Sequence, residues 1–134
     1  MAEITPEIKE VTENTRIFAL ATASKDGVPN VAYIRFGKIF TDDKLLFIDN
    51  FMLKTRKNID ENPKVAVLVW GKDSPKAFQF KGTARVETSG DTFDEGIQWV
   101  RSMNPKLNPK AVVVVKIDDI YIGTAGANAG KKVE

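Results

Sequence analysis

The 134-residue chain contains no cysteine and no histidine. Without cysteine it has no disulfide, no thiolate metal site, no iron–sulfur ligand and no cysteine nucleophile. Without histidine it has no imidazole ligand for a metal and no Ser-His or Cys-His relay. We therefore expect no metal site and no catalytic triad, and a difficult reaction would depend on the chemistry of a bound cofactor.

The chain also has little net charge and no long apolar run. Its formal charge of +2 does not by itself indicate nucleic acid or a membrane as a partner. No segment approaches the roughly 18 apolar residues of a transmembrane helix, and the acidic opening segment is unlike a signal peptide. We expect one domain over residues 1–134, in the cytoplasm, with a mobile tail over residues 124–134.

Apolar segments with strand character alternate with short polar turns over most of the chain. Strands are expected over 17–24, 29–40, 45–50, 65–70, 77–88 (interrupted at Gly82) and 111–123 (kinked at Asp118-Asp119). Helices are expected over 6–14, from Lys54 to Asn62-Pro63, and over 91–104. The pattern predicts a mainly β (α+β) fold: a six-stranded antiparallel barrel with two to three peripheral helices.

The third helical segment carries an apolar stripe of Phe93, Ile97 and Val100, spaced by four and three residues. Trp99 falls off this stripe, so it faces either a ligand or a partner subunit. For Tyr33, Trp70 and Phe78, contact with a flat ligand ring and packing in the core or an interface both remain open.

The stretch Lys54-Thr55-Arg56-Lys57 places three cations at the start of the second helical segment. Free backbone N–H groups and the helix dipole favour an anion there, and Lys54 and Thr55 would add an ammonium and a hydroxyl donor. Cations at such a position are unfavourable by several tenths of a kcal/mol each, unless an anion binds. The alternative is a solvated group of side chains whose aliphatic stems cover the barrel.

Three stretches carry a resemblance to a known family: "FALATASKDGVPNVAYIRF", "LLFIDNFMLKTRKNIDENPKVAVLVW" and "FQFKGTARV". In this order they resemble the opening hairpin, the third strand with its phosphate-binding helix start, and a later strand of the pyridoxamine 5'-phosphate oxidase-like FMN-binding split barrels. The resemblance implies a split barrel and a homodimer that holds two FMN molecules at its interface.

Carried over by position, Lys54 and Thr55 match the family's phosphate-binding residues, and the segments 33–36 and 48–50 would line the flavin ring. Lys38 matches a family lysine, but Tyr33 stands where the oxidase has an arginine. Arg35 shares a strand face with Tyr33, so it is the candidate replacement. The expected cofactor-binding residues are Tyr33, Ile34, Arg35, Lys38, Ile48, Asp49, Asn50, Lys54 and Thr55.

Two departures argue against oxidation of pyridoxamine phosphate itself. Ala77 stands where the oxidase has a flavin-contacting glutamine, and the oxidase's C-terminal segment with tryptophan and arginine has no counterpart. We expect an FMN-dependent oxidoreductase that acts on a small molecule or redox partner, with no catalytic residue identified. The alternative is a carrier of a flavin, a deazaflavin or haem. Nucleic acid is not expected as a partner, because the cations gather at one helix start and not along a strand face. A membrane is not expected either, since the net charge is small and no apolar run is long enough to span one.

Overall fold

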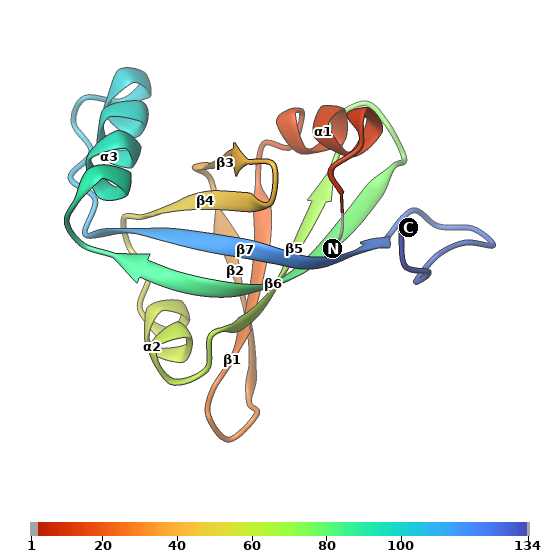
Figure 1. Cartoon of the computed structure of the whole chain (residues 1–134), viewed down its shortest axis with the longest axis horizontal. Helices are drawn as coiled ribbons and strands as arrows, with labels where there is room; N and C mark the ends of the chain where they lie inside the picture. Colours follow the sequence, from red (N-terminus) through yellow and green to blue (C-terminus); the bar gives the residue numbers. More distant parts are fainter. Residues whose placement is uncertain (1–2, 134) are drawn as a thin grey trace.

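The computed structural model describes residues 3–133, which form seven strands and three helices (Figure 1). The elements follow in the order α1 (Pro6–Glu13), β1 (Phe18–Ala23), β2 (Pro29–Ile34), β3 (Gly37–Thr41), β4 (Lys44–Asp49), α2 (Lys54–Glu61), β5 (Lys64–Trp70), β6 (Ala77–Glu87), α3 (Asp91–Met103) and β7 (Ala111–Ile122). Met1 and Ala2 of the expected opening segment, and Glu134 of the expected tail, lie outside the described residues.

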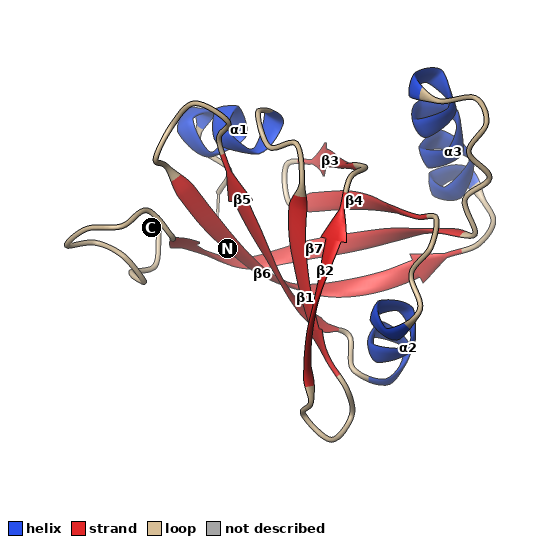
Figure 2. Cartoon of the chain, turned by 180° about the vertical axis from the view of Figure 1, so that it is seen from behind, coloured by secondary structure: helices blue, strands red, loops and turns tan. Residues whose placement is uncertain are grey.

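All seven strands belong to one antiparallel sheet with the order β2-β1-β5-β6-β7-β4-β3. The two edge strands, β2 and β3, are consecutive in the chain, so the sheet must curl until its edges are joined through Arg35 and Phe36 (Figures 1 and 2). The carbonyl of Phe36 accepts a hydrogen bond from the N–H of Ile48 at 3.0 Å, which ties this junction to β4. The predicted mainly β split barrel is confirmed.

The barrel has seven strands where six were predicted, because the expected strand 29–40 is divided. It ends at Ile34 on one edge of the sheet and resumes at Gly37 on the other. At Gly37 the backbone lies against the ring of Phe47, and a Cβ there would come within 2.6 Å of the ring carbons. The glycine therefore permits the close approach at which the chain changes edges.

The predicted kink in the last strand is a β-bulge, and the predicted interruption at Gly82 is a close approach within a continuous β6. The register passes from Lys81 opposite Asp119 to Gly82 opposite Ile117, so Asp118 is the extra residue. A Cβ at Gly82 would lie 2.3 Å from the carbonyl oxygen of Lys116. Glycine is therefore required at this position by the neighbouring backbone.

The apolar residues form two clusters, one inside the barrel and one between α3 and the outer face of β4 and β7. The second cluster explains why β4 and β7 are apolar on both faces. It contains Leu46, Ile48, Val100, Val112 and Val114.

Helix α3 contacts this cluster with Phe93 and Val100 of the predicted stripe, but not with Ile97. Gly96, not Ile97, lies against the sheet, where a Cβ would be 2.6 Å from Val112. Trp99, predicted to lie off the buried stripe, packs against the cluster together with Phe93. The missing side chain at Gly96 lets the helix approach the sheet more closely than the periodicity of large residues indicated.

The segment after β7 folds back on the strand. The N–H of Val133 donates to the carbonyl of Ile120 at 2.8 Å, and the Lys132 ammonium lies 2.9 Å from a carboxylate oxygen of Asp119. This hydrogen-bonded ion pair raises the pKa of Lys132. The mobility expected for this tail stays a prediction. Among residues 3–133, no helix has both the length and the apolar character needed to cross a bilayer.

We expect Gly82→Ala to lower the free energy of unfolding by about 1–3 kcal/mol, because the new methyl group must displace backbone of β7. Urea unfolding followed by circular dichroism measures this. Gly71→Ala is the matched control, since its Cβ would meet only an ordinary contact at 3.4 Å from Ser74. Equal stabilities of the two variants would contradict the close approach.

Candidate functional site

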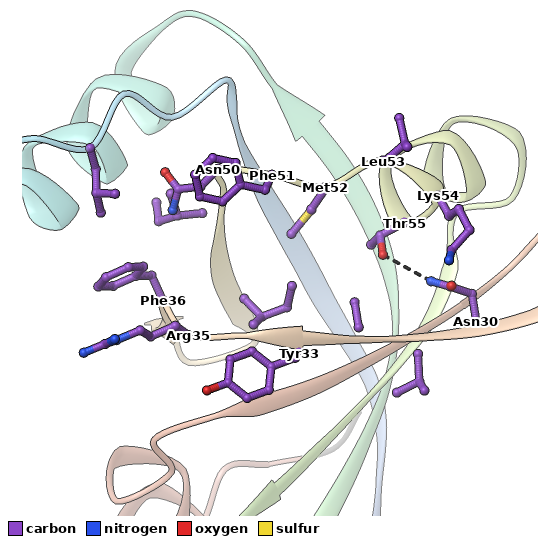
Figure 3. A pocket seen from close by; sticks show the side chains of 15 residues that line it. Asn30, Tyr33, Arg35, Phe36, Asn50, Phe51, Met52, Leu53, Lys54 and Thr55 are labelled. Atoms are coloured by element: carbon purple, nitrogen blue, oxygen red, sulfur yellow. Dashed lines mark hydrogen bonds between the residues drawn. The ribbon is translucent and has the colours of Figure 1, made fainter.

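A groove with a volume of about 530 Å³ lies between β2, the segment after β4, and the start of α2 (Figure 3). This volume is in the range of small-molecule sites. We call it the main groove. Its lining residues are Asn30, Val31, Ala32, Tyr33, Ile34, Arg35, Phe36, Ile48, Asn50, Phe51, Met52, Leu53, Lys54, Thr55 and Leu107.

The main groove brings together most of the residues predicted to bind a cofactor. These are Tyr33, Ile34, Arg35, Ile48, Asn50, Lys54 and Thr55. Lys54 and Thr55 lie at one end of the groove, and Arg35 lies toward the other end with Phe36 (Figure 3). The side chains of Lys38 and Asp49 do not line it.

The start of α2 forms one end of the groove and has no side-chain cap. Its N-cap residue, Leu53, offers no acceptor, and the first turn holds no acidic residue. By contrast, the Thr5 hydroxyl of α1 accepts from the N–H of Ile8 at 3.3 Å, and α3 begins with acidic residues. The free N–H groups at the start of α2 therefore favour an anion that the chain itself does not supply.

Thr55 presents a hydroxyl group at this helix start, although only 4% of the residue is exposed. Its Oγ1 accepts a hydrogen bond from the side-chain amide of Asn30 at 3.2 Å (Figure 3). No acceptor among the described residues takes the proton of this hydroxyl, so it can be donated to a ligand oxygen.

Buried amides and hydroxyls below α2 fix this arrangement. Asn30 also approaches the hydroxyl of Thr22 at 3.4 Å, and Asn58 of α2 donates to the same hydroxyl at 3.0 Å. Asn30 was missed by the sequence reasoning. Its signal was a polar residue within an apolar strand, but its function depends on the register that places it opposite Thr22 and beside α2.

Asp49 is fully buried and anchors the loop after β4 instead of facing the groove. One carboxylate oxygen accepts from the backbone N–H of Met52 at 2.9 Å, and the other accepts from the guanidinium of Arg56 at 2.9 Å. The Lys110 ammonium lies 3.9 Å from the carboxylate and donates to the carbonyl of Met52 at 3.0 Å. Asp49 therefore places the first turn of α2 relative to β4.

Lys38 lies outside the main groove, on β3. Its ammonium is 4.6 Å from the centre of the Trp99 ring, within range of a cation–π interaction. The resemblance predicts that Lys38 binds the cofactor, but its ammonium lies over Trp99 of α3 in this chain.

The rim of the main groove is apolar and unusually exposed. Val31 and Tyr33 on β2 are 69% and 75% exposed, and Phe51 and Leu53 on the opposite side are 88% and 81% exposed. A cluster of exposed large apolar side chains around a groove is typical of an interaction surface.

We expect Arg56→Met to lower the free energy of unfolding by about 3 kcal/mol, because it leaves the buried Asp49 carboxylate without its closest cation. Chemical denaturation measures the loss. Lys57→Met removes the same charge from an exposed neighbour on α2 and should change stability by about 0.5 kcal/mol or less. A similar loss in both variants would argue against an anchoring role for the ion pair.

Comparison with known proteins agrees with this fold. Residues 4–122 match the family model described as pyridoxamine 5'-phosphate oxidase. Uncharacterized protein MJ0282 of Methanocaldococcus jannaschii is 43% identical over 99% of this chain and 89% of its own length. This identity over nearly the whole chain shows that the two proteins are related over their full fold.

Solved structures share the architecture. HupZ of Group A Streptococcus has a TM-score of 0.82 at 28% identity, covering 95% of this chain and 99% of its own. An FMN-binding protein from Syntrophomonas wolfei subsp. wolfei has a TM-score of 0.77 at 20% identity, covering 90% and 88%.

Structures named for other cofactors also share the fold. The haem storage protein HutZ from Vibrio cholerae has a TM-score of 0.69 at 17% identity, covering 90% of this chain and 95% of its own. An F420 reductase has a TM-score of 0.66 at 19% identity, covering 84% and 94%. The family match covers all seven strands of the split barrel, so the chain belongs to the pyridoxamine 5'-phosphate oxidase-like family.

Proposed function

We propose that the main groove binds FMN and that the protein is a flavin-dependent oxidoreductase. The observation that carries the proposal is the uncapped start of α2, where Lys54 and the hydroxyl of Thr55 accompany free N–H groups. A phosphate monoester fits this donor set, because it carries two negative charges and several acceptor oxygens. Bound FMN would supply hydride or single-electron transfer, which the side chains of this protein do not provide.

The opposite end of the groove suits a flat heterocycle. Tyr33, Phe36 and Phe51 offer aromatic surface, and Ile48 and Met52 offer aliphatic surface. The side-chain oxygen of Asn50 is buried and has no hydrogen-bond partner among the described residues. An acceptor left in this state costs roughly 1–3 kcal/mol, which an N–H donor of the ligand would recover. The imide N–H of an isoalloxazine ring is such a donor.

The protein's part in catalysis would be binding and exclusion of water. Lys54 and Thr55 hold the phosphate, Asn30 keeps the Thr55 hydroxyl turned toward the ligand, and Asp49 fixes the turn between β4 and α2. This chain lacks two features that the resemblance gives for oxidation of pyridoxamine phosphate, the flavin-contacting glutamine and the C-terminal segment with tryptophan and arginine. The protein is therefore a flavin oxidoreductase with another substrate.

A second candidate is a carrier that holds a flavin, a deazaflavin or haem without turnover. Two structures with the same fold, named a haem storage protein and an F420 reductase, support this second candidate. The sequence has no histidine to serve as a haem ligand, which counts against haem. Turnover of reduced nicotinamide with a generic electron acceptor separates the two, because a carrier would be reduced only by its protein partner.

We expect Lys54→Ala to weaken FMN binding by about 30- to 150-fold, since losing one partner of a charge-assisted contact costs on the order of 2–3 kcal/mol. Riboflavin, which lacks the phosphate, should bind the variant almost as it binds the unchanged protein. Titrations followed by flavin fluorescence give both affinities.

Lys57→Ala is the control for this titration, because it removes an exposed cation on the same helix that does not line the groove. Equal losses for FMN and riboflavin would place the phosphate elsewhere. A purified protein that neither retains nor takes up FMN would refute the proposal as a whole.

We further propose that a second copy of the chain covers the exposed rim and the outer face of β1, β2 and β5. On that face Tyr33 lies opposite Ala19, which lies opposite Leu68, so that a small residue separates two large exposed ones. Trp70, 39% exposed, continues the apolar surface along β5. Burial of such a face stabilises a dimer by roughly 25 cal/mol per Å² of apolar area, before the costs of association.

We expect light scattering to give the mass of a dimer and Leu68→Asp to give that of a monomer, because a carboxylate would be buried in the interface. Lys72→Glu, in the loop between β5 and β6, serves as the control for added negative charge. A Leu68→Asp protein that remains dimeric would exclude this face as the interface.

A further inference from the structure

A second groove, which we call the side groove, opens beside the main groove. Its volume is about 900 Å³, and it runs between the segment before β1, the junction of β2 and β3, and the end of α3. Tyr33, Arg35, Phe36 and Leu107 line both grooves, so the two adjoin each other. A ligand in the side groove would therefore lie next to whatever occupies the main groove.

The side groove is positively charged. Arg16 and Arg35 both line it and both are exposed, and no acidic residue is among the described residues that line it. Arg16 also lines a separate groove together with Glu7, Glu10 and Glu13 of α1, but no carboxylate oxygen among the described residues lies within ion-pair distance of Arg16 or Arg35. Two guanidinium groups without a carboxylate partner favour an anionic ligand, and guanidinium geometry suits carboxylate or phosphate oxygens.

The remaining wall of the side groove is apolar and partly aromatic. Phe36, Trp99, Met103 and Leu107 contribute to it, and Met103 is 51% exposed. The Trp99 indole is held beneath Lys38 at 4.6 Å, which fixes the ring and adds a third positive charge nearby. Such a wall favours a ligand with a flat apolar body, because aromatic faces stack.

We propose that the side groove binds flat organic anions, with Arg16 and Arg35 holding the anionic group and Trp99 contacting the apolar body. The inference rests on the proposed function in one respect: beside a bound flavin, this site would define the substrate class of the oxidoreductase. The binding site itself depends only on the residues of the side groove.

The test uses the two tryptophans of the chain. Trp70 is on β5 and does not line the side groove, so Trp70→Phe leaves Trp99 as the only tryptophan reporter. Flavin-free Trp70→Phe protein is titrated with 4-nitrobenzoate and with its neutral isostere 4-nitrobenzamide, and quenching of Trp99 fluorescence is recorded. Calorimetry repeats both titrations without an optical signal.

We expect 4-nitrobenzoate to bind about tenfold or more tightly than 4-nitrobenzamide, since a charge-assisted hydrogen bond is stronger than a neutral one. Adding Arg16→Gln should remove most of this preference, and Arg16→Lys should restore part of it. Lys9→Gln changes the net charge equally on the exposed surface of α1 and should leave the preference intact.

Equal affinity for the two probes, or a preference that survives Arg16→Gln in a folded protein, would overturn the inference. The outcome is separable from that of the FMN titration. Selective binding of 4-nitrobenzoate by a protein that takes up no FMN would support the anion site while refuting the flavin proposal. FMN uptake without selective quenching of Trp99 by 4-nitrobenzoate would support the flavin proposal and refute the anion site.

Discussion

The buried carboxylate of Asp49 is the interaction on which the arrangement of the main groove depends. It ends β4, accepts the N–H of Met52, and pairs with Arg56 of α2. A carboxylate removed from water is unfavourable without such partners, so both contacts are needed to keep Asp49 buried. The turn between β4 and α2 is thereby fixed, and with it the direction in which the first N–H groups of the helix point.

This ion pair also explains why the cations at the start of α2 have different roles. Arg56 is used internally by Asp49, Lys57 is exposed, and Lys54 is the cation of the cluster that lines the groove. The sequence shows only that the charges are adjacent. A helix places successive residues about 100° apart, so adjacent cations point to different surroundings. The phosphate hypothesis therefore concerns one lysine, one threonine and the backbone.

The sequence allowed the fold and the position of the groove to be predicted, because strand periodicity, turn residues and the proline after Asn62 are local signals. The division of the strand at Ile34 could not be predicted, because it depends on the contact of Gly37 with Phe47 across the barrel. Asn30 was missed and Asp49 was expected at the flavin for a similar reason. Asn30 meets Thr22 across the β1–β2 hairpin and Thr55 at the start of α2, and Asp49 meets Arg56 across the turn into α2. The direction of each side chain therefore depends on how the chain folds there, and no local pattern records it.

Membership of the family leaves the substrate open, and the structure indicates why. The groove for the proposed cofactor is built from β2, β4 and α2, and it shares Ile34 and Met52 with the barrel interior. The side groove takes Arg16 from the segment before β1, and Trp99 and Met103 from α3, all outside that interior. Residues at these places can change without disturbing the barrel core, so one fold can combine a common cofactor site with different substrate sites. Lys38 illustrates the point: it matches the family's pattern in sequence, yet it lies over Trp99 and supports the wall of the side groove.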